Sequence, residues 1–266
     1  MPIIIRYFLV CFFCLFASSA WGKANIGVWP IKVFLFPKHA IGEVHLVNKG
    51  ENEVKLQVYA KSWDIDETGK FVETDTGEFV FYPRLLAIPS GEEKVLRVGY
   101  NGDFPPYEKA YRLYIHELPK IGEPEKPEKG MTAGLNILLR LSLPLFVSPS
   151  DTPPTPQPEI EEVALTAEGI RLAVKNQGTH HFMVEKIEAR IVDKEGETLS
   201  SGEKKTHILR ILPQRRVFFD IPLSLEDCSL AKQVEIHLFL EDMKEPMVHS
   251  EPIEHGCTVD KGSAKN

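Results

Sequence analysis

The side chains that could do chemistry in this sequence do not form a catalytic or metal-binding pattern. It has no Gly-x-Ser-x-Gly motif, no glycine-rich phosphate loop and no His-Glu-x-x-His motif. The nine histidines are scattered, and only His180 and His181 are adjacent. Neighbouring strand positions point to opposite faces, so we interpret this pair as surface or turn histidines. Residues 64–68 resemble a calcium loop faintly but lack its spacing and closing Glu. The sequence therefore predicts a protein that is not an enzyme and has no cofactor or metal.

The first residues differ in composition from the rest of the chain. Residues 1–22 carry one early cation, then an apolar run, then small residues. This is the layout of a secretory signal peptide, and the apolar run is short for a membrane-spanning helix. We expect cleavage between Ala20 and Ala24, with a retained anchor as the alternative. Two of the four cysteines, Cys11 and Cys14, would leave with the signal.

The remaining cysteines, Cys228 and Cys257, form an even pair in an exported chain, which predicts one disulfide. The bond would close a loop of about thirty residues and stabilise the fold by roughly 3 kcal/mol in the chain-entropy model. Two unpaired thiols are the alternative. The two cysteines lack the paired spacing of a zinc site.

Composition describes a globular chain long enough for two domains. Of its 266 residues, 43% are hydrophobic and 26% are charged. The net charge is −7 and the isoelectric point is about 5.8. Because no block of Lys and Arg stands out, nucleic acid is not an expected partner.

A proline-rich segment divides the chain. Residues 148–158 contain five prolines, which favour a stiff and extended linker. We therefore expect an N-terminal domain at 25–147 and a C-terminal domain at 159–258, each near the size of an immunoglobulin-type sandwich. The polar residues 259–266 are expected to form a disordered tail.

Both halves alternate apolar and polar residues between turn residues, with almost no helical period. The strands expected in the first half are 26–36, 43–48, 54–63, 79–82, 85–88, 94–100, 110–118 and 135–147. Those expected in the second half are 160–165, 170–175, 184–192, 217–221 and 234–240. The predicted fold class is all-β, with two immunoglobulin-like β-sandwich domains joined by the Pro-rich linker.

The longest apolar stripe lies at the end of the first half. Every odd position from 135 to 143 is a large aliphatic residue: Leu135, Ile137, Leu139, Leu141 and Leu143. Alternate side chains of a strand share a face, so these five would form one continuous surface. They could form the core face of a sandwich strand. They could equally lie at a sheet edge that enters a groove of another protein.

Short fragments follow one another in a characteristic order over most of residues 28–147. They are 28–31, 44–50, 61–63, 66–69, 88–92, 96–97, 111–113, 117–119 and 141–146. In this order they resemble the periplasmic pilus-assembly chaperones of chaperone–usher systems, and most closely their archaic, spore-coat-like branch.

The resemblance implies a periplasmic chaperone that binds incomplete-sandwich pilus subunits and delivers them to an outer-membrane usher. In this family the last strand of the first domain fills the gap left by the missing strand of the subunit. The five aliphatic residues of the stripe would then be the donor residues. The implied partners are pilus or spore-coat-like subunits and the usher, with no small-molecule substrate.

Classical members of the family also anchor the terminal carboxylate of the subunit with two basic residues. Lys32 occupies the position of the first, whereas Pro144 occupies the second and supplies neither charge nor N–H. The anchor is then Lys32 alone or includes Arg97, Arg112 or Arg140. The alternative for Lys32 is a solvated lysine on an edge strand.

Two other functions are weighed against this one. An exported structural or adhesive two-sandwich component of a surface assembly would need a donor extension, for which the mature N-terminus at 23–26 is short. A secreted hydrolase would need a nucleophile–base pair or a metal cluster, and the sequence shows neither.

Overall fold

The computed structural model describes residues 25–119, 137–151, 155–166, 168–224, 230–241 and 243–253. Their ordered elements are all strands, as the all-β prediction requires. None of these residues forms a helix with the length and apolarity that a membrane crossing needs. Within the same ranges no group of His, Cys, Asp and Glu side chains could hold a metal ion.

Several predicted features lie outside the described residues. They are the signal peptide at 1–22, the first donor residue Leu135, the cysteines Cys228 and Cys257, and the tail at 259–266. Their predictions therefore stay untested.

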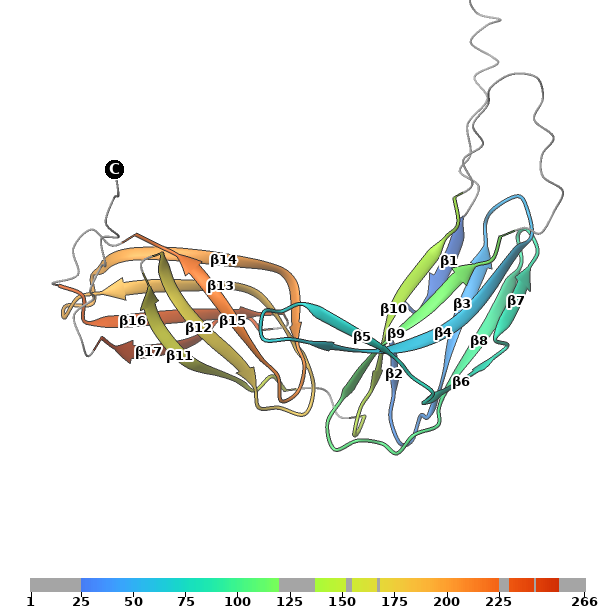
Figure 1. Cartoon of the computed structure of the whole chain (residues 1–266), viewed down its shortest axis with the longest axis horizontal. Helices are drawn as coiled ribbons and strands as arrows, with labels where there is room; N and C mark the ends of the chain where they lie inside the picture. The colour runs from blue at the N-terminus through green and yellow to red at the C-terminus, as the bar shows by residue number, and fades with distance from the viewer. Residues whose placement is uncertain are drawn as a thin grey trace, which may run out of the picture.

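Two sheets form an N-terminal sandwich (Figure 1). The first has the order β1 (Ile26–Trp29), β3 (Ile41–Asn48), β8 (Glu93–Tyr100) and β6 (Phe79–Tyr82). The second has the order β2 (Val33–Leu35), β10 (Arg140–Val147), β9 (Lys109–Glu117), β4 (Val54–Ile65) and β5 (Phe71–Asp75), with β7 (Leu85–Ile88) also paired to β4. Alternate residues of the long strands, such as Val44 and Leu46, fill the core between the sheets.

The expected first strand at 26–36 is two strands in the structure. β1 pairs antiparallel with β3, whereas β2 pairs parallel with β10 in the other sheet. The chain therefore changes sheets at residues 30–32, where Pro30 cannot donate a ladder hydrogen bond. This crossing places Lys32 immediately before β2, next to one edge of β10.

Two further sheets form a C-terminal sandwich. One has the order β11 (Pro158–Thr166), β12 (Gly169–Asn176) and β15 (Arg216–Pro222). The other has the order β14 (Thr198–Ile211), β13 (Phe182–Val192), β16 (Gln233–Leu240) and β17 (Met247–Pro252). The sequence did not predict β14 or β17. β14 is polar on both faces from Ser200 to Thr206, so only its pairing with β13 defines it as a strand.

The same buried turn occurs in both sandwiches. Asn48 and Asn176 are fully buried, and the side-chain oxygen of each accepts the N–H of the glycine two residues later. The side-chain amide of each donates to two backbone carbonyls, those of Asn52 and Ile88 for Asn48 and those of His180 and Ile211 for Asn176. Because a buried amide must be hydrogen-bonded, each Asn fixes its turn against a facing strand. The Asn176 turn thereby positions the residues that begin β13.

β4 and β5 form a long hairpin that reaches the C-terminal sandwich (Figure 1). At its tip the Phe218 N–H donates to the Glu67 carbonyl at 2.9 Å. Arg215 pairs with Asp64 at 2.5 Å, and Arg216 pairs with Glu67 at 2.8 Å. These ion pairs are largely exposed, so each contributes little to stability.

Apolar packing joins the two sandwiches more strongly. Trp63, Ile65, Ala110 and Phe146 belong to the same buried cluster as the core of the C-terminal sandwich. They lie on the outer face of the second sheet, because β4, β9 and β10 turn their other alternate residues into the N-terminal core. The outer face of this sheet therefore forms one wall of a cleft between the sandwiches.

Candidate functional site

One edge of β10 is only partly covered. β10 pairs along its whole length with β9, from Arg140↔His116 to Val147↔Lys109. β2 covers its other edge only at residues 145–147. No other strand in the described part of the chain pairs with β10, so residues 140–144 present a free edge.

The hydrogen-bond pattern identifies the backbone groups on this free edge. The Glu117 N–H donates to the Leu139 carbonyl at 2.8 Å, so Leu139 points its backbone groups toward β9. In an antiparallel pair the direction alternates with each residue. Arg140 and Ser142 therefore direct their N–H and C=O groups to the free edge. Pro144 belongs to the same set, so its missing N–H costs the β9 ladder nothing.

The predicted stripe changes from exposed to buried along this segment. Ile137 is 72% exposed, Leu139 and Leu141 are half-buried, and Leu143 is 8% exposed inside the core of the N-terminal sandwich. The strand starts at Arg140, later than the expected start at residue 135. Ile137, Leu139 and part of Leu141 are thus accessible to a partner, whereas Leu143 fills its own core.

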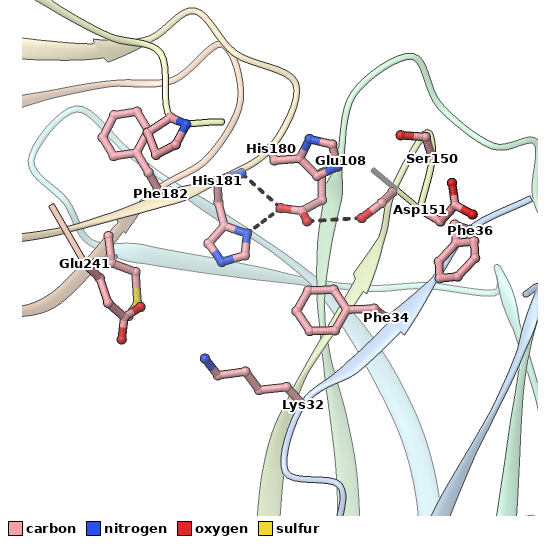
Figure 2. A pocket seen from close by; sticks show the side chains of 13 residues that line it. Lys32, Phe34, Phe36, Glu108, Ser150, Asp151, His180, His181, Phe182 and Glu241 are labelled. Atoms are coloured by element: carbon pink, nitrogen blue, oxygen red, sulfur yellow. Dashed lines mark hydrogen bonds and ion pairs between the residues drawn. The ribbon is translucent and has the colours of Figure 1, made fainter. Parts of the chain in front are cut away.

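Lys32 lies at the end of the free edge and lines a cavity of ≈ 360 Å³ between the sandwiches (Figure 2). β2 starts one residue later and runs parallel to β10, with Val33 opposite Leu145. A strand added to residues 140–144 would therefore lie in line with β2 and terminate near Lys32. No ion pair joins Lys32 to a carboxylate in the described ranges.

Arg112 lies on the face of β9 that is directed toward the cleft, beside the end of the free edge. It is opposite Pro144 in the register of β9 and β10. Its guanidinium lies over the rings of Trp63 and Phe71, at 5.4 Å and 5.8 Å from their centroids. Among the described residues it has no carboxylate partner. β10 has Pro144 where a basic anchor residue is expected, and Arg112 supplies a positive charge directly opposite on β9.

The other two arginines that the sequence offered lie elsewhere. Arg97 belongs to β8 in the opposite sheet, where its side chain pairs with Glu43 at 3.0 Å. Arg140 is exposed at the start of β10, four residues before Pro144. Neither position brings its charge to the end of the free edge beside Lys32.

Arg210 is a cation of the cleft that the sequence reasoning missed. It lies on β14 opposite Met183, which lines the cavity. Its Nε atom is buried and makes no hydrogen bond to any described residue. Burial lowers the pKa of Arg210, and the positive charge of Arg112 lowers that pKa further against the opposing effect of Glu241 and Glu108. The buried Nε atom without a partner leaves Arg210 with a donor for an acceptor group that enters the cleft.

Several buried groups that line the cavity hydrogen-bond to one another or stack (Figure 2). The buried Glu108 accepts hydrogen bonds from the His181 backbone N–H at 3.1 Å and from the Ser148 hydroxyl at 3.2 Å. The Nδ1 atom of His181 lies 2.5 Å from the same carboxylate. The His181 ring stacks on Phe146 at 4.3 Å, and Phe146 also stacks with Phe34 at 5.3 Å.

This arrangement corrects one sequence interpretation. His181 was expected to be a surface or turn histidine. It does lie immediately before β13, but its side chain is only 15% exposed and contacts Glu108. The neighbouring His180 is part-buried as well, and burial lowers its pKa. The partner of His181 is 73 residues away in the sequence, so the histidine pair alone could not reveal the contact.

A comparison with protein families found a match for the first part of the chain. Residues 28–153 match the family described as "Pili and flagellar-assembly chaperone, PapD N-terminal domain". A comparison with curated proteins found no match.

Several solved structures share the fold. One is a chain of the CsuC–CsuE chaperone–tip adhesion subunit pre-assembly complex from archaic chaperone-usher Csu pili of Acinetobacter baumannii, at 19% identity over 85% of this chain and 98% of that chain, with a TM-score of 0.56. Another is the class 5 fimbriae chaperone CfaA, at 18% identity over 85% and 99%, with a TM-score of 0.56. A third is a chain of the Salmonella enterica SafA pilin in complex with the SafB chaperone, at 15% identity over 88% and 99%, with a TM-score of 0.55.

At these identities the likeness shows the fold alone. The predicted class, all-β with two immunoglobulin-like sandwiches, is confirmed. The TM-score is the same for the archaic chaperone complex and for the class 5 chaperone, so the assignment to the archaic branch stays a prediction.

Proposed function

We propose that this chain stabilises incomplete pilus subunits by donor-strand complementation, because its residues 28–153 match the family of pilus-assembly chaperones. One observation carries the proposal: residues 140–144 of β10 present a free edge, next to accessible aliphatic side chains, and this edge terminates at Lys32. A subunit that lacks one strand could pair with that edge through its main chain.

The accessible side chains do not carry the interaction alone. Burial of the exposed Ile137 is worth about 1.5–3 kcal/mol, and burial of the half-buried Leu139 and Leu141 is worth less for each. Their sum therefore stays below about 9 kcal/mol, which is comparable with the cost of association, for which estimates start at about 4 kcal/mol. Main-chain hydrogen bonds to Arg140 and Ser142, and a charge at the end of the strand, must contribute the rest.

The position of Lys32 favours one direction for the client strand. A strand that runs parallel to β10 would bring its C-terminal carboxylate to Lys32. The N-terminal end of an antiparallel strand would instead lie near Lys32. If that end carried the free ammonium group of the chain, its charge would repel Lys32. Parallel addition is therefore favoured, with Arg112 and Arg210 adding positive charge to the cleft.

We extend the proposal to the location of the protein and to a second partner. The protein acts in the periplasm after removal of residues 1–22, and it delivers the subunit to an outer-membrane usher. The family relation supports both statements, and the apolar run of the predicted signal peptide supports export.

Co-expression tests this function. A pilus subunit that lacks its last strand should aggregate when produced alone, and it should be recovered as a soluble one-to-one complex when this chain is present. A subunit that is equally soluble without the chain would contradict the proposal. Polymers formed by the purified chain alone would instead favour the alternative, an exported structural or adhesive component of a surface assembly.

A further inference from the structure

The cavity beside Lys32 is larger than a carboxylate group requires. Its volume of ≈ 360 Å³ is at the lower end of the range for ligand pockets, enough for a large side chain. Phe34 and Phe36 line it from the N-terminal sandwich, and Phe182 and Met183 line it from the C-terminal sandwich. Phe34 stays 47% exposed, which leaves an aromatic surface without a complete cover.

Most polar groups of this cavity are already engaged. Glu108 is bound by His181 and Ser148, and Asp151 lies 3.6 Å from the ammonium group of Lys38. The surface left for a ligand is therefore mainly aromatic and aliphatic, apart from the amino group of Lys32 and the carboxylate of Glu241. Figure 2 shows Lys32 beside Phe34, with its amino group directed toward the wall that carries Glu241.

We propose that this cavity is a specificity pocket for the last side chain of the client subunit. It selects a large apolar or aromatic residue whose own carboxylate is held at Lys32. This inference rests on the proposed function, in which the client strand terminates in line with β2. The terminal residue of such a strand has its carboxylate at the amino group of Lys32 and its side chain next to the cavity.

The charges around the pocket disfavour the other classes of side chain. Glu241 and the buried Glu108 line the pocket, as does Lys32. An acidic side chain would meet Glu241 and Glu108, whereas a basic one would meet Lys32. A small polar side chain would leave Phe34 uncovered.

Three labelled hexapeptides of the same alternating sequence test the inference by fluorescence anisotropy with the full chain. They end in Phe with a free carboxylate, in Ser with a free carboxylate, and in Phe with a terminal amide. Burial of a large apolar side chain should make the Phe acid bind about tenfold more tightly than the Ser acid, or more. The Phe34→Ala variant should lose that preference. Tyr82→Ala is the matched control, because Tyr82 is an aromatic residue, 70% exposed, on the opposite sheet.

The outcomes separate this pocket from the carboxylate anchor. Equal binding of the Phe acid and the Ser acid, both tighter than the amide, would overturn the pocket and leave the anchor intact. Equal binding of the Phe acid and its amide, both tighter than the Ser acid, would support the pocket and overturn the anchor. Absence of binding of the Phe acid at about 1 mM would also overturn the pocket. The peptide comparison uses the unmodified protein, so it holds even if Phe34→Ala does not fold.

Discussion

Replacement of Ile137 and Leu139 by Asp is expected to abolish capture of the client subunit, with a loss of affinity of about 100-fold to 10,000-fold. Ile137 would lose about 1.5–3 kcal/mol of burial and the half-buried Leu139 would lose less, and two carboxylates would be forced into the apolar groove of the client. Ile137 is 72% exposed and Leu139 is half-buried, so the free protein should fold normally. Pull-down of the subunit and its dissociation constant measure the effect.

The matched control is the pair of substitutions Ile41→Asp and Val80→Asp. Ile41 and Val80 are 63% and 59% exposed, and they lie on the other sheet of the same sandwich. These substitutions add the same charge to a comparable apolar surface and should leave capture intact. If the control pair and the donor pair weaken capture equally, the contact is general apolar adhesion and the donor strand is contradicted.

Lys32→Met is expected to weaken client binding by about 10-fold to 100-fold. A hydrogen bond to a charged group contributes about 1.5–3 kcal/mol, and loss of the cation leaves the terminal carboxylate in a partly apolar cleft. Lys32→Arg should keep most of the affinity, because Arg also presents donors to a carboxylate. Titration calorimetry with a subunit that has a free C-terminus measures the difference.

Two comparisons make this prediction specific. Lys55→Met removes an exposed lysine from β4, away from the cleft, and should not change the affinity. A subunit with an amidated C-terminus should bind the Lys32→Met protein and the unmodified protein equally. If Lys32→Met binds the free-acid subunit as tightly as the unmodified protein does, Lys32 is only a solvated edge lysine.

The sequence predicted the long strands well because their alternation reflects burial on one face. It could not predict where the chain changes sheets, since residues 26–36 have strand character on both sides of Pro30. It also missed β14, whose polar residues from 200 to 206 carry no alternating signal. Such segments are defined by the neighbouring strand and not by their own composition.

The stripe shows the same limit within one strand. Alternation gives Ile137, Leu139, Leu141 and Leu143 a common face, but it does not say what covers each of them. The structure places Leu143 in the core of its own sandwich and leaves Ile137 exposed, because the sandwich extends only as far as the middle of the stripe.

The cleft could be predicted only in part. The family pattern identified Lys32 and offered Arg112 among three arginines, whereas Arg210 joins them because two sandwiches pack through Trp63 and its neighbours. The contact between Glu108 and His181 arises in the same way. Such pairs lie on different domains, and no local pattern in the sequence joins them.

Amide hydrogen exchange at Arg140 and Ser142, measured by NMR with and without the client subunit, tests strand donation most directly. Both N–H groups face the free edge of β10, whereas those of Leu141 and Leu143 face β9. Donation of this edge predicts that client binding slows exchange at Arg140 and Ser142 by about tenfold or more, with smaller changes at Leu141 and Leu143. Unchanged exchange at Arg140 and Ser142 in a saturated complex would show that the subunit binds elsewhere.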